Sequence, residues 1–275
     1  MEPTLSIITI NFNNNEGLKQ TMASVLPQLN DKVEYLVIDG GSSDGSAETI
    51  KSKASQLTYY CSEKDNGIYN AMNKGVAHAK GEYLLFLNSG DILFSPTIIA
   101  QVLPLLDGTD IVYGNIIFHN SQRDVLVKYP DVLYADNLLK GSLPHPGSFI
   151  RRELLEKTPY NESLRICADW EFFAKKIVVD GCSTKHIPLT ISIFMEDGIS
   201  SVNKELTLKE RNECIPHIFS PCVIRVCEEW RAYSNCSAAE EFAQIAKTRK
   251  LHRRIKPLLR AIIRINNIFS SERHH

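Results

Sequence analysis

The sequence lacks the features that mark several common classes of protein. No apolar run approaches the roughly 20 residues that a membrane-spanning helix needs, and no basic region precedes the first apolar run as it would in a secretory signal peptide. The seven cysteines show no CxxC spacing, which favours reduced thiols and disfavours a zinc site. The formal net charge of -1 gives no sign of nucleic-acid binding. We therefore expect a cytoplasmic globular protein with no nucleic-acid partner.

Two nucleotide-binding motifs are also missing. No GxGxxG follows the first apolar run, and no GxxxxGK[ST] occurs anywhere in the chain. Both absences weigh against a dinucleotide-dependent oxidoreductase and against a P-loop enzyme. A chain of 275 residues is long enough for one large domain, or for one domain with an appendage.

Short apolar runs alternate with segments of helical periodicity through the first part of the chain. The expected strands cover residues 5–10, 33–38, 57–61 and 82–87, and the expected helices cover residues 16–28, 46–54 and 67–79. Short connections between alternating strands and helices predict a parallel, right-handed α/β sheet with flanking helices.

The apolar run that begins at Glu82 predicts a strand buried on both faces. It ends in the polar turn Asn88-Ser89-Gly90-Asp91. Ligands of such sheets bind beyond the carboxyl ends of the strands, which is where Asp91 and Asp39 would lie. The alternative is that Asp91 only caps a following helix, because Asp is a preferred capping residue.

The second part of the chain has a less regular pattern. We expect a helix over residues 98–106, a hairpin of 110–118 with 125–129, a helix over 168–179 with Asp169 in its first turn, an extended run over 186–194, and helices from 204 onward. The segment 143–150 has too much proline for a central strand.

A basic amphipathic segment, residues 247–264, lies near the C-terminus. Its lysines and arginines alternate with leucines and isoleucines, and it contains no acid. Such a helix can bind an anionic membrane surface from the cytoplasmic side. The alternatives are that it packs on its own domain or serves a homodimer. We divide the chain into a domain over residues 1–203 and a helical, basic extension over residues 204–275.

Four ordered motifs make the chain similar to a known family. They are Thr9-Ile-Asn-Phe-Asn13, Val37-Ile-Asp-Gly-Gly-Ser-Ser-Asp-Gly45, Ser62-Glu-Lys-Asp-Asn-Gly-Ile-Tyr-Asn-Ala-Met-Asn-Lys-Gly75 and Gly81-Glu-Tyr-Leu-Leu-Phe-Leu-Asn-Ser-Gly-Asp91. Together they resemble the family 2 glycosyltransferases of the GT-A fold, which has a Rossmann-like, mostly parallel central sheet. The resemblance covers roughly residues 4 to 201, and the third motif is close to bacterial enzymes that build surface polysaccharides.

The resemblance implies a nucleotide-sugar site. Thr9, Asn11 and Asp39 would hold the base and ribose, and Asp65 and Lys74 match positions near the nucleotide and its phosphates. The implied donor site also includes two residues of later segments, Ser89 and His145.

The resemblance also implies a divalent metal, Mn²⁺ or Mg²⁺, at Asp91. This residue matches the last carboxylate of the family's DxD-type motif, of which the turn Asn88-Ser89-Gly90-Asp91 keeps only that acid. One carboxylate can hold such an ion if diphosphate oxygens and waters complete its shell. Strict metal dependence is left open by this departure.

Asp169 matches the position of the family's catalytic base. An inverting transfer needs a carboxylate that accepts the proton of the acceptor hydroxyl. Glu171 is the competing candidate, but two residues further along a helix it should point away from Asp169.

The resemblance thus predicts an inverting, metal-assisted hexosyl- or N-acetylhexosaminyltransferase. It would move a sugar from a nucleoside diphosphate donor, most commonly a UDP-sugar in this family, to a glycan or lipid-linked glycan in surface polysaccharide synthesis. Two alternatives stay open: a nucleotidyltransferase on a related sheet, and a non-catalytic subunit that binds nucleotide-sugars or acts as a scaffold.

Overall fold

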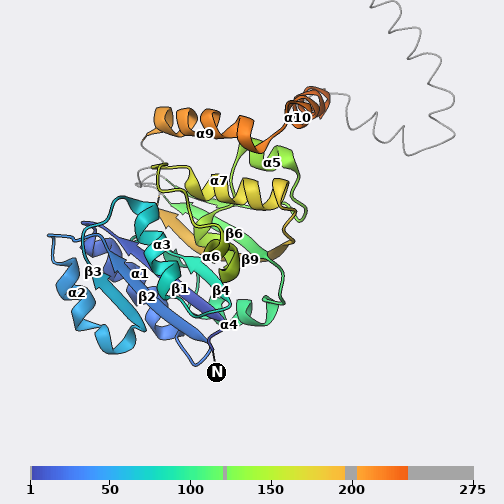
Figure 1. Ribbon diagram of the computed structural model, residues 1–275. Helices are drawn as coiled ribbons and strands as arrows, with labels where there is room; N and C mark the ends of the chain where they lie inside the picture. The colour runs from blue at the N-terminus through green and yellow to red at the C-terminus, as the bar shows by residue number, and fades with distance from the viewer. Residues whose placement is uncertain (1, 120–122, 196–202, 235–275) are drawn as a thin grey trace, which may run out of the picture. The chain divides into compact units, whose positions relative to one another are not determined.

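The computed structural model describes residues 2–119, 123–195 and 203–234 (Figure 1). Its first part alternates strands with helices, as the sequence predicts. These elements are β1 (Leu5–Asn11), α1 (Asn15–Val25), β2 (Val33–Asp39), α2 (Ser46–Ser52), β3 (Tyr59–Ser62), α3 (Ile68–His78) and β4 (Tyr83–Phe86). Short 3₁₀ turns, Leu26–Gln28 and Ala54–Gln56, extend α1 and α2.

The later elements are less regular. They are β5 (Ile92–Leu93), α4 (Ile98–Val102), β6 (Ile111–His119), β7 (Asp124–Val127), α5 (Ala135–Lys140), β8 (Ser148–Arg151), α6 (Arg152–Lys157), α7 (Ala168–Ala174), β9 (Thr184–Met195), α9 (Lys204–Ile218) and α10 (Pro221–Ser234). Two 3₁₀ turns, Leu103–Leu105 and His145–Gly147, and a π-helical turn, Lys175–Val179, complete the described elements.

The described strands form one nine-stranded sheet with the order β3-β2-β1-β4-β8-β6-β9-β5, and β7 pairs with β6. Strands β3, β2, β1 and β4 run parallel to one another. Beyond β4 the sheet is mixed, because β8 runs antiparallel to both β4 and β6 whereas β6 and β9 run parallel. The expected α/β fold with a mostly parallel sheet, flanking helices and C-terminal helices is confirmed.

One strand prediction was wrong. The segment 143–150 was expected to be too rich in proline for a central strand, yet β8 lies between β4 and β6 inside the sheet. Pro144 and Pro146 are found just before the strand, at the turn His145–Gly147, where no N–H is needed for the sheet. The strand therefore begins at Ser148, after the last proline.

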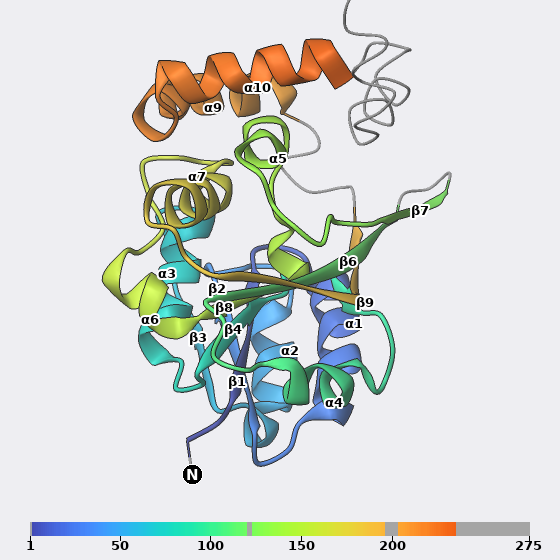
Figure 2. The same ribbon diagram turned by 90° about the vertical axis from the view of Figure 1, so that its right-hand side faces the viewer.

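Helices cover both faces of the parallel part of the sheet (Figure 2). On one face, Leu18 and Met22 of α1 and Ile99 of α4 join a buried apolar cluster with the strands. On the other face, α3 approaches β1 so closely that a Cβ on Gly75 would lie 2.5 Å from Cγ2 of Ile8. Glycine is therefore required at this helix position, and the contact fixes α3 against the sheet.

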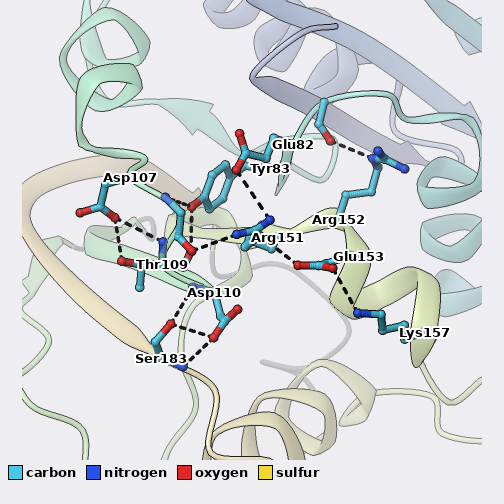
Figure 3. A network of polar contacts seen from close by, with 12 residues as sticks. Glu82, Tyr83, Asp107, Thr109, Asp110, Arg151, Arg152, Glu153, Lys157 and Ser183 are labelled. Carbon is cyan, nitrogen blue, oxygen red and sulfur yellow. Dashed lines mark hydrogen bonds and ion pairs between the residues drawn. The ribbon is translucent and has the colours of Figure 1, made fainter.

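A polar network holds the amino end of β4, away from the turn that ends in Asp91 (Figure 3). The Tyr83 hydroxyl accepts a hydrogen bond from the Gly108 N–H (2.9 Å) and donates one to the Thr109 carbonyl (2.8 Å). Arg151 donates to the Gly108 carbonyl (3.1 Å) and pairs with Glu153 (3.2 Å). These contacts tie β4, β8 and the loop before β6 together at one end of the sheet.

The chain divides into two compact units, Met1–Ser220 and Pro221–His275. Helix α9 belongs to the first unit and packs on α7. The domain boundary predicted after residue 203 stays a prediction. The basic segment 247–264 lies outside the described residues. Within the described ranges, no helix is both long and apolar enough to cross a membrane.

Candidate functional site

The register of the sheet brings three polar side chains together where β1, β2 and β3 end. Asn11 is paired in register with Asp39, and Asp39 with Ser62. Asn11 Nδ2 donates to Asp39 Oδ1 (2.6 Å), and the Ser62 hydroxyl donates to Asp39 Oδ2 (2.6 Å). The carboxyl edge predicted from the sequence thus carries a polar cluster centred on Asp39.

The Gly-rich loop after β2 completes the surroundings of Asp39. The Ser42 hydroxyl donates to Oδ1 (2.5 Å) and the Ser42 N–H donates to Oδ2 (3.0 Å). Burial by itself raises the pKa of the Asp39 carboxyl, but the hydrogen bonds from Ser42, Ser62 and Asn11 outweigh burial and hold that pKa below its ordinary range. Asp39 is therefore a fixed, ionised acceptor.

Asp65 and Lys74 form an ion pair beside this cluster. Lys74 Nζ lies 2.5 Å from Asp65 Oδ1 and 2.7 Å from Glu63 Oε1. A Cβ placed on Gly40 would lie 3.2 Å from Asp65 Oδ2, so the Asp65 carboxylate lies against the loop that follows Asp39. The hydrogen bonds that Lys74 donates to Asp65 and Glu63 raise the pKa of Lys74 above its ordinary range, which keeps this cation charged.

Phe12 offers an exposed ring at the same edge. Its side chain is 65% exposed, although the residues before it in β1 are buried. A Cβ on Gly40 would lie 3.2 Å from Phe12 Cδ2, so the ring lies next to the Asp39 loop. An exposed aromatic ring beside a fixed carboxylate is suited to stacking a nucleotide base. Sequence analysis did not single out Phe12, although its position directly after Asn11 was a usable signal.

Thr9 lies apart from this cluster. Its side chain is fully buried, and its hydroxyl lies 2.9 Å from the Tyr35 hydroxyl of the neighbouring strand β2. The structure thus accounts for Thr9 as a buried hydrogen-bonding partner. Its contact with a nucleotide stays a prediction.

The turn after β4 is held by backbone contacts. Asp91 Oδ2 accepts a hydrogen bond from the Asn88 N–H (3.1 Å), and Gly90 adopts a φ of +108°, which favours glycine. The Ser89 carbonyl accepts a hydrogen bond from Asn14 Nδ2 (2.9 Å), and the Ser89 N–H donates to the Ile10 carbonyl (3.0 Å), so these contacts are made by its main chain. The turn places Asp91, a residue that is 3% exposed, just beyond β4.

The donor set at this turn limits how a metal could be held. Among the described residues, no group of three His, Cys, Asp or Glu side chains is arranged to hold a metal ion. A single carboxylate fits a hard divalent cation only when other oxygens, such as those of a diphosphate, supply most of its ligands. Asp91 fits that role as one ligand among several.

A chain of polar contacts connects this turn to Asp169. Asn88 Nδ2 lies 3.2 Å from His145 Nε2, and His145 Nδ1 lies 3.4 Å from Asp169 Oδ2. The hydroxyl of Tyr69, on α3, lies 2.8 Å from Asp169 Oδ1. His145 and Tyr69, from two other segments, thus meet at the Asp169 carboxylate, and Asn88 is linked to it through His145. The Asp169 side chain is 17% exposed.

The surroundings of His145 and Asp169 favour their charged forms. Burial by itself lowers the pKa of His145, but the hydrogen bond and charge of Asp169, together with the charge of Asp91, raise it above the ordinary value of 6.5. Burial by itself raises the pKa of Asp169, but His145 and the Tyr69 hydroxyl outweigh burial and lower it below the ordinary value of 3.8. Asp169 is therefore ionised at neutral pH.

Glu171 makes different contacts. Its Oε1 lies 2.7 Å from Lys175 Nζ and 3.9 Å from Cys214 Sγ. The two acids of α7 thus have separate partners, as the helical spacing predicts, and Asp169 is the one joined to His145. Tyr69 belongs to the third sequence motif and to the helix expected over residues 67–79, but it was given no role, and its spacing to Asp169 in the sequence gave no signal of their contact.

Comparisons with known proteins found related glycosyltransferases. An uncharacterized glycosyltransferase of Mycobacterium tuberculosis is 35% identical over 205 residues, which are 72% of this chain and 78% of the relative. A PGL/p-HBAD biosynthesis glycosyltransferase of Mycobacterium bovis is 29% identical over 204 residues, which are 71% of this chain and 78% of the relative.

Solved structures with low sequence identity share the fold. TarS residues 1–349 of S. aureus, in complex with UDP-GlcNAc, gives a TM-score of 0.64 at 18% identity, covering 79% of this chain and 65% of that chain. The mannosyltransferase PcManGT of Pyrobaculum calidifontis, in complex with GDP-Man and Mn²⁺, gives 0.58 at 17% identity, covering 92% of this chain and 83% of that chain. Residues 6–165 match the family described as Glycosyl transferase family 2. The chain belongs to this family of glycosyltransferases.

Proposed function

We propose that the chain is an inverting glycosyltransferase that takes its sugar from a nucleoside diphosphate donor and uses Asp169 as the catalytic base. The observation that carries the proposal is the position of this carboxylate. It is ionised, it is partly exposed, and it is linked through His145 to the turn that holds Asp91. The proposed base, Asp169, and the proposed metal ligand, Asp91, would thereby belong to one site.

The donor's nucleoside would bind at the carboxyl ends of β1, β2 and β3. Asp39 would accept hydrogen bonds from ribose or base, Asn11 would support that carboxylate, and the exposed ring of Phe12 would stack on the base. Solved neighbours with UDP-GlcNAc and with GDP-Man support a nucleotide-sugar donor. Of these nucleotides, UDP is the one that we propose.

The chemistry proposed for Asp169 is proton acceptance. As the acceptor hydroxyl oxygen forms its bond to the anomeric carbon, its proton passes to an Asp169 oxygen. The bond from the anomeric carbon to the diphosphate breaks on the opposite face, and the nucleoside diphosphate leaves with the electron pair. The sugar configuration is inverted as a result. The Tyr69 hydroxyl and His145 orient the carboxylate during this step.

A divalent cation would be held by Asp91 together with oxygens of the donor diphosphate. When bound, it would neutralise negative charge on the leaving group. Neighbours solved with Mn²⁺ support manganese as the ion to test first. Lys74 is charged and lies beside the nucleotide cluster, but the structure pairs it with Asp65 and Glu63. We propose that it acts on the donor phosphates while held by these acids.

The acceptor that we propose is a glycan or lipid-linked glycan of a bacterial surface polysaccharide, reached from the cytoplasmic side of the membrane. Support comes from the third sequence motif, and attachment to the membrane would depend on the basic segment 247–264. A homodimer is the other use that this segment could have. A non-catalytic, nucleotide-sugar-binding subunit is the alternative function, favoured by the single acid in the Asn88–Asp91 turn.

Donor turnover separates these functions. Purified native chain, Asp169→Asn and Glu171→Gln would be given UDP-GlcNAc, UDP-glucose or GDP-mannose with Mn²⁺, and release of nucleoside diphosphate would be measured with and without a bacterial glycolipid extract. We expect acceptor-stimulated release by the native chain and by Glu171→Gln, and a loss of about 100-fold or more in Asp169→Asn. Equal release by native chain and Asp169→Asn would overturn the assignment of the base.

A further inference from the structure

The segment that leads into the proposed base has no regular structure of its own. Between the end of α6 at Lys157 and the start of α7 at Ala168, the chain forms only turns and irregular backbone. The residue that caps α7, Cys167, makes no capping hydrogen bond with its side chain. The position of Asp169 in the first turn of α7 therefore depends on what holds this segment.

One side of the segment is held by α3. Asn73 Nδ2 donates to the Tyr160 carbonyl (2.9 Å), and Asn73 Oδ1 accepts from the Tyr160 N–H (3.0 Å). Asn70 Nδ2 donates to Glu162 (2.9 Å). The Tyr69 hydroxyl lies 2.5 Å from the Ile166 carbonyl as well as 2.8 Å from Asp169 Oδ1. Three residues of one motif helix thus contact the segment along its length.

The other side is held by a single acid of α9. The Glu210 carboxylate accepts three backbone hydrogen bonds from consecutive residues: Arg165 N–H to Oε1 (2.8 Å), Ile166 N–H to Oε2 (3.0 Å) and Cys167 N–H to Oε2 (3.0 Å). Glu210 is 6% exposed. Charge-assisted bonds in a buried place are stronger than those at the surface. The carboxylate therefore fixes the backbone immediately before α7.

Both polar backbone groups of Ile166 are thereby held by different helices. Its N–H is bound by Glu210 of α9, and its carbonyl is bound by Tyr69 of α3. The same Tyr69 hydroxyl touches the Asp169 carboxylate. A shift of Ile166 would therefore change the distance between the Tyr69 hydroxyl and Asp169.

A neighbouring residue fixes α9 itself. The Arg211 guanidinium lies 4.4 Å from the centroid of the Trp170 ring and donates to the carbonyls of Leu138, Leu139 and Gly141. Trp170 follows Asp169 in α7, and its Nε1 donates to the Leu138 carbonyl (2.7 Å). Figure 1 shows α9 running alongside α7. Helix α9 is thus joined to the backbone just before α7, through Glu210, and to Trp170 within α7, through Arg211.

We propose that Glu210 is a positioning residue for the glycosyl transfer, and that α9 contributes to the active site by holding the backbone before Asp169. Glu210 holds the backbone of residues 165–167, and this backbone sets the place of Asp169 relative to Tyr69 and His145. The inference rests on the proposed role of Asp169 as base. Residues 6–165 match the family, so Glu210 lies beyond the matched region. No part of the donor or acceptor needs to touch Glu210 for it to act.

The test compares Glu210→Gln with Glu213→Gln, an exposed acid on the same helix. Turnover of UDP-sugar with Mn²⁺ is divided by the fraction of protein that binds UDP, so that unfolded molecules do not count. We expect a fall of about 10- to 100-fold in this normalised kcat for Glu210→Gln, because a shift of about 1 Å in a reacting group has such an effect. The Kd for UDP should change less than about twofold, and Glu213→Gln should match the native chain.

The dependence of kcat on pH gives a second measurement, because kcat should fall on the acidic side as Asp169 becomes protonated. Contact with the Tyr69 hydroxyl helps to lower the pKa of Asp169, so displacement of Asp169 should move this fall in kcat to higher pH in Glu210→Gln. Glu210→Asp, which keeps the charge on a shorter side chain, should fall between Glu210→Gln and the native chain. A role in stability alone would lower the binding-competent fraction but leave the normalised kcat and its dependence on pH unchanged.

The outcomes separate the two proposals. If Asp169→Asn abolishes turnover while Glu210→Gln keeps the native normalised kcat, the role of Glu210 is overturned and the proposed base stands. If Asp169→Asn keeps turnover, the assignment of Asp169 as base is overturned, and the positioning role of Glu210, which rests on it, is overturned as well. A double-mutant cycle adds a direct check: Tyr69→Phe and Glu210→Gln should be non-additive, because both act on Ile166. Strictly additive losses would contradict the proposal.

Discussion

His145 Nδ1 lies 3.4 Å from Asp169 Oδ2, and this contact joins the turn after β4 to the first turn of α7. The imidazole also feels the charge of Asp91, while its Nε2 faces the Asn88 amide. Asp169 is in turn held by the Tyr69 hydroxyl. A histidine that favours its charged form between two carboxylates should make the stability of the site depend on pH.

The sign of that dependence follows from the two shifts. The pKa of His145 is raised, so its contribution to stability is present below its ordinary value of 6.5 and is lost as the pH rises through the raised pKa. The pKa of Asp169 is lowered, so its contribution is present above its ordinary value of 3.8 and is lost as the pH falls through the lowered pKa. Both contributions are present together between these two ordinary values.

We therefore predict that His145→Gln destabilises the metal-free, nucleotide-free protein more at about pH 6 than at about pH 9. Urea unfolding of the native chain and the variant at both pH values measures the difference in the free energy of unfolding. The difference in the free energy of unfolding between the native chain and His145→Gln should become smaller as the pH rises. The same difference at both pH values would show that His145 and Asp169 do not interact as a charged pair.

A second prediction concerns Phe12. Its ring is 65% exposed, so its removal should leave the stability of the fold nearly unchanged. If the ring stacks on the nucleotide base, Phe12→Ala should weaken UDP binding by about 1 to 3 kcal/mol. Phe12→Tyr keeps an aromatic face and serves as the matched control. Calorimetric titration with UDP measures all three proteins, and equal affinities for Phe12→Ala and the native chain would place the base elsewhere.

A third prediction uses the network at the other end of β4. The Tyr83 hydroxyl bridges the Gly108 N–H and the Thr109 carbonyl (Figure 3). Tyr83→Phe should lower the free energy of unfolding by about 1 to 3 kcal/mol, because two backbone groups lose their partner. Tyr60→Phe, at a side chain that is 38% exposed, should have little effect. Affinity for UDP should be unchanged in both variants, because the network lies at the amino end of β4 and the proposed nucleotide site lies at the carboxyl ends of the strands. A large loss of UDP affinity in Tyr83→Phe would contradict this placement of the nucleotide site.

Much of the parallel half of the sheet could be predicted because three of its strands, β1, β2 and β4, are mostly apolar and buried on both faces. The end of β2 was therefore visible in the sequence, and with it the place of Asp39 at the carboxyl edge. The central position of β8 could not be predicted, because Pro144 and Pro146 lie just before the strand and made the whole segment 143–150 look unsuitable. The proline content of a segment does not show which single N–H groups the pairing of strands needs, and both prolines precede those of β8.

The contacts around Asp169 were beyond sequence reasoning for a different reason. Tyr69 and Asp169 are separated by 100 residues, and Cys167 and Glu210 by 43. Such contacts depend on how helices pack on the sheet, and no local periodicity reports them. The resemblance to a family pointed to Asp169 itself, but it gave no indication of the groups that hold it.

The central claim is that a nucleoside diphosphate and a divalent metal bind together at this edge of the sheet. The most direct test is the melting temperature of the native chain and of Asp91→Ala with UDP, GDP or dTDP, each with and without Mn²⁺. A ligand that binds only the folded protein raises the melting temperature, and ligand at 100 times its Kd adds about 2.7 kcal/mol. We predict that UDP with Mn²⁺ stabilises the native chain, and that Asp91→Ala loses the part that depends on Mn²⁺. No stabilisation by any nucleoside diphosphate, or the same Mn²⁺-dependent gain in Asp91→Ala, would contradict the claim.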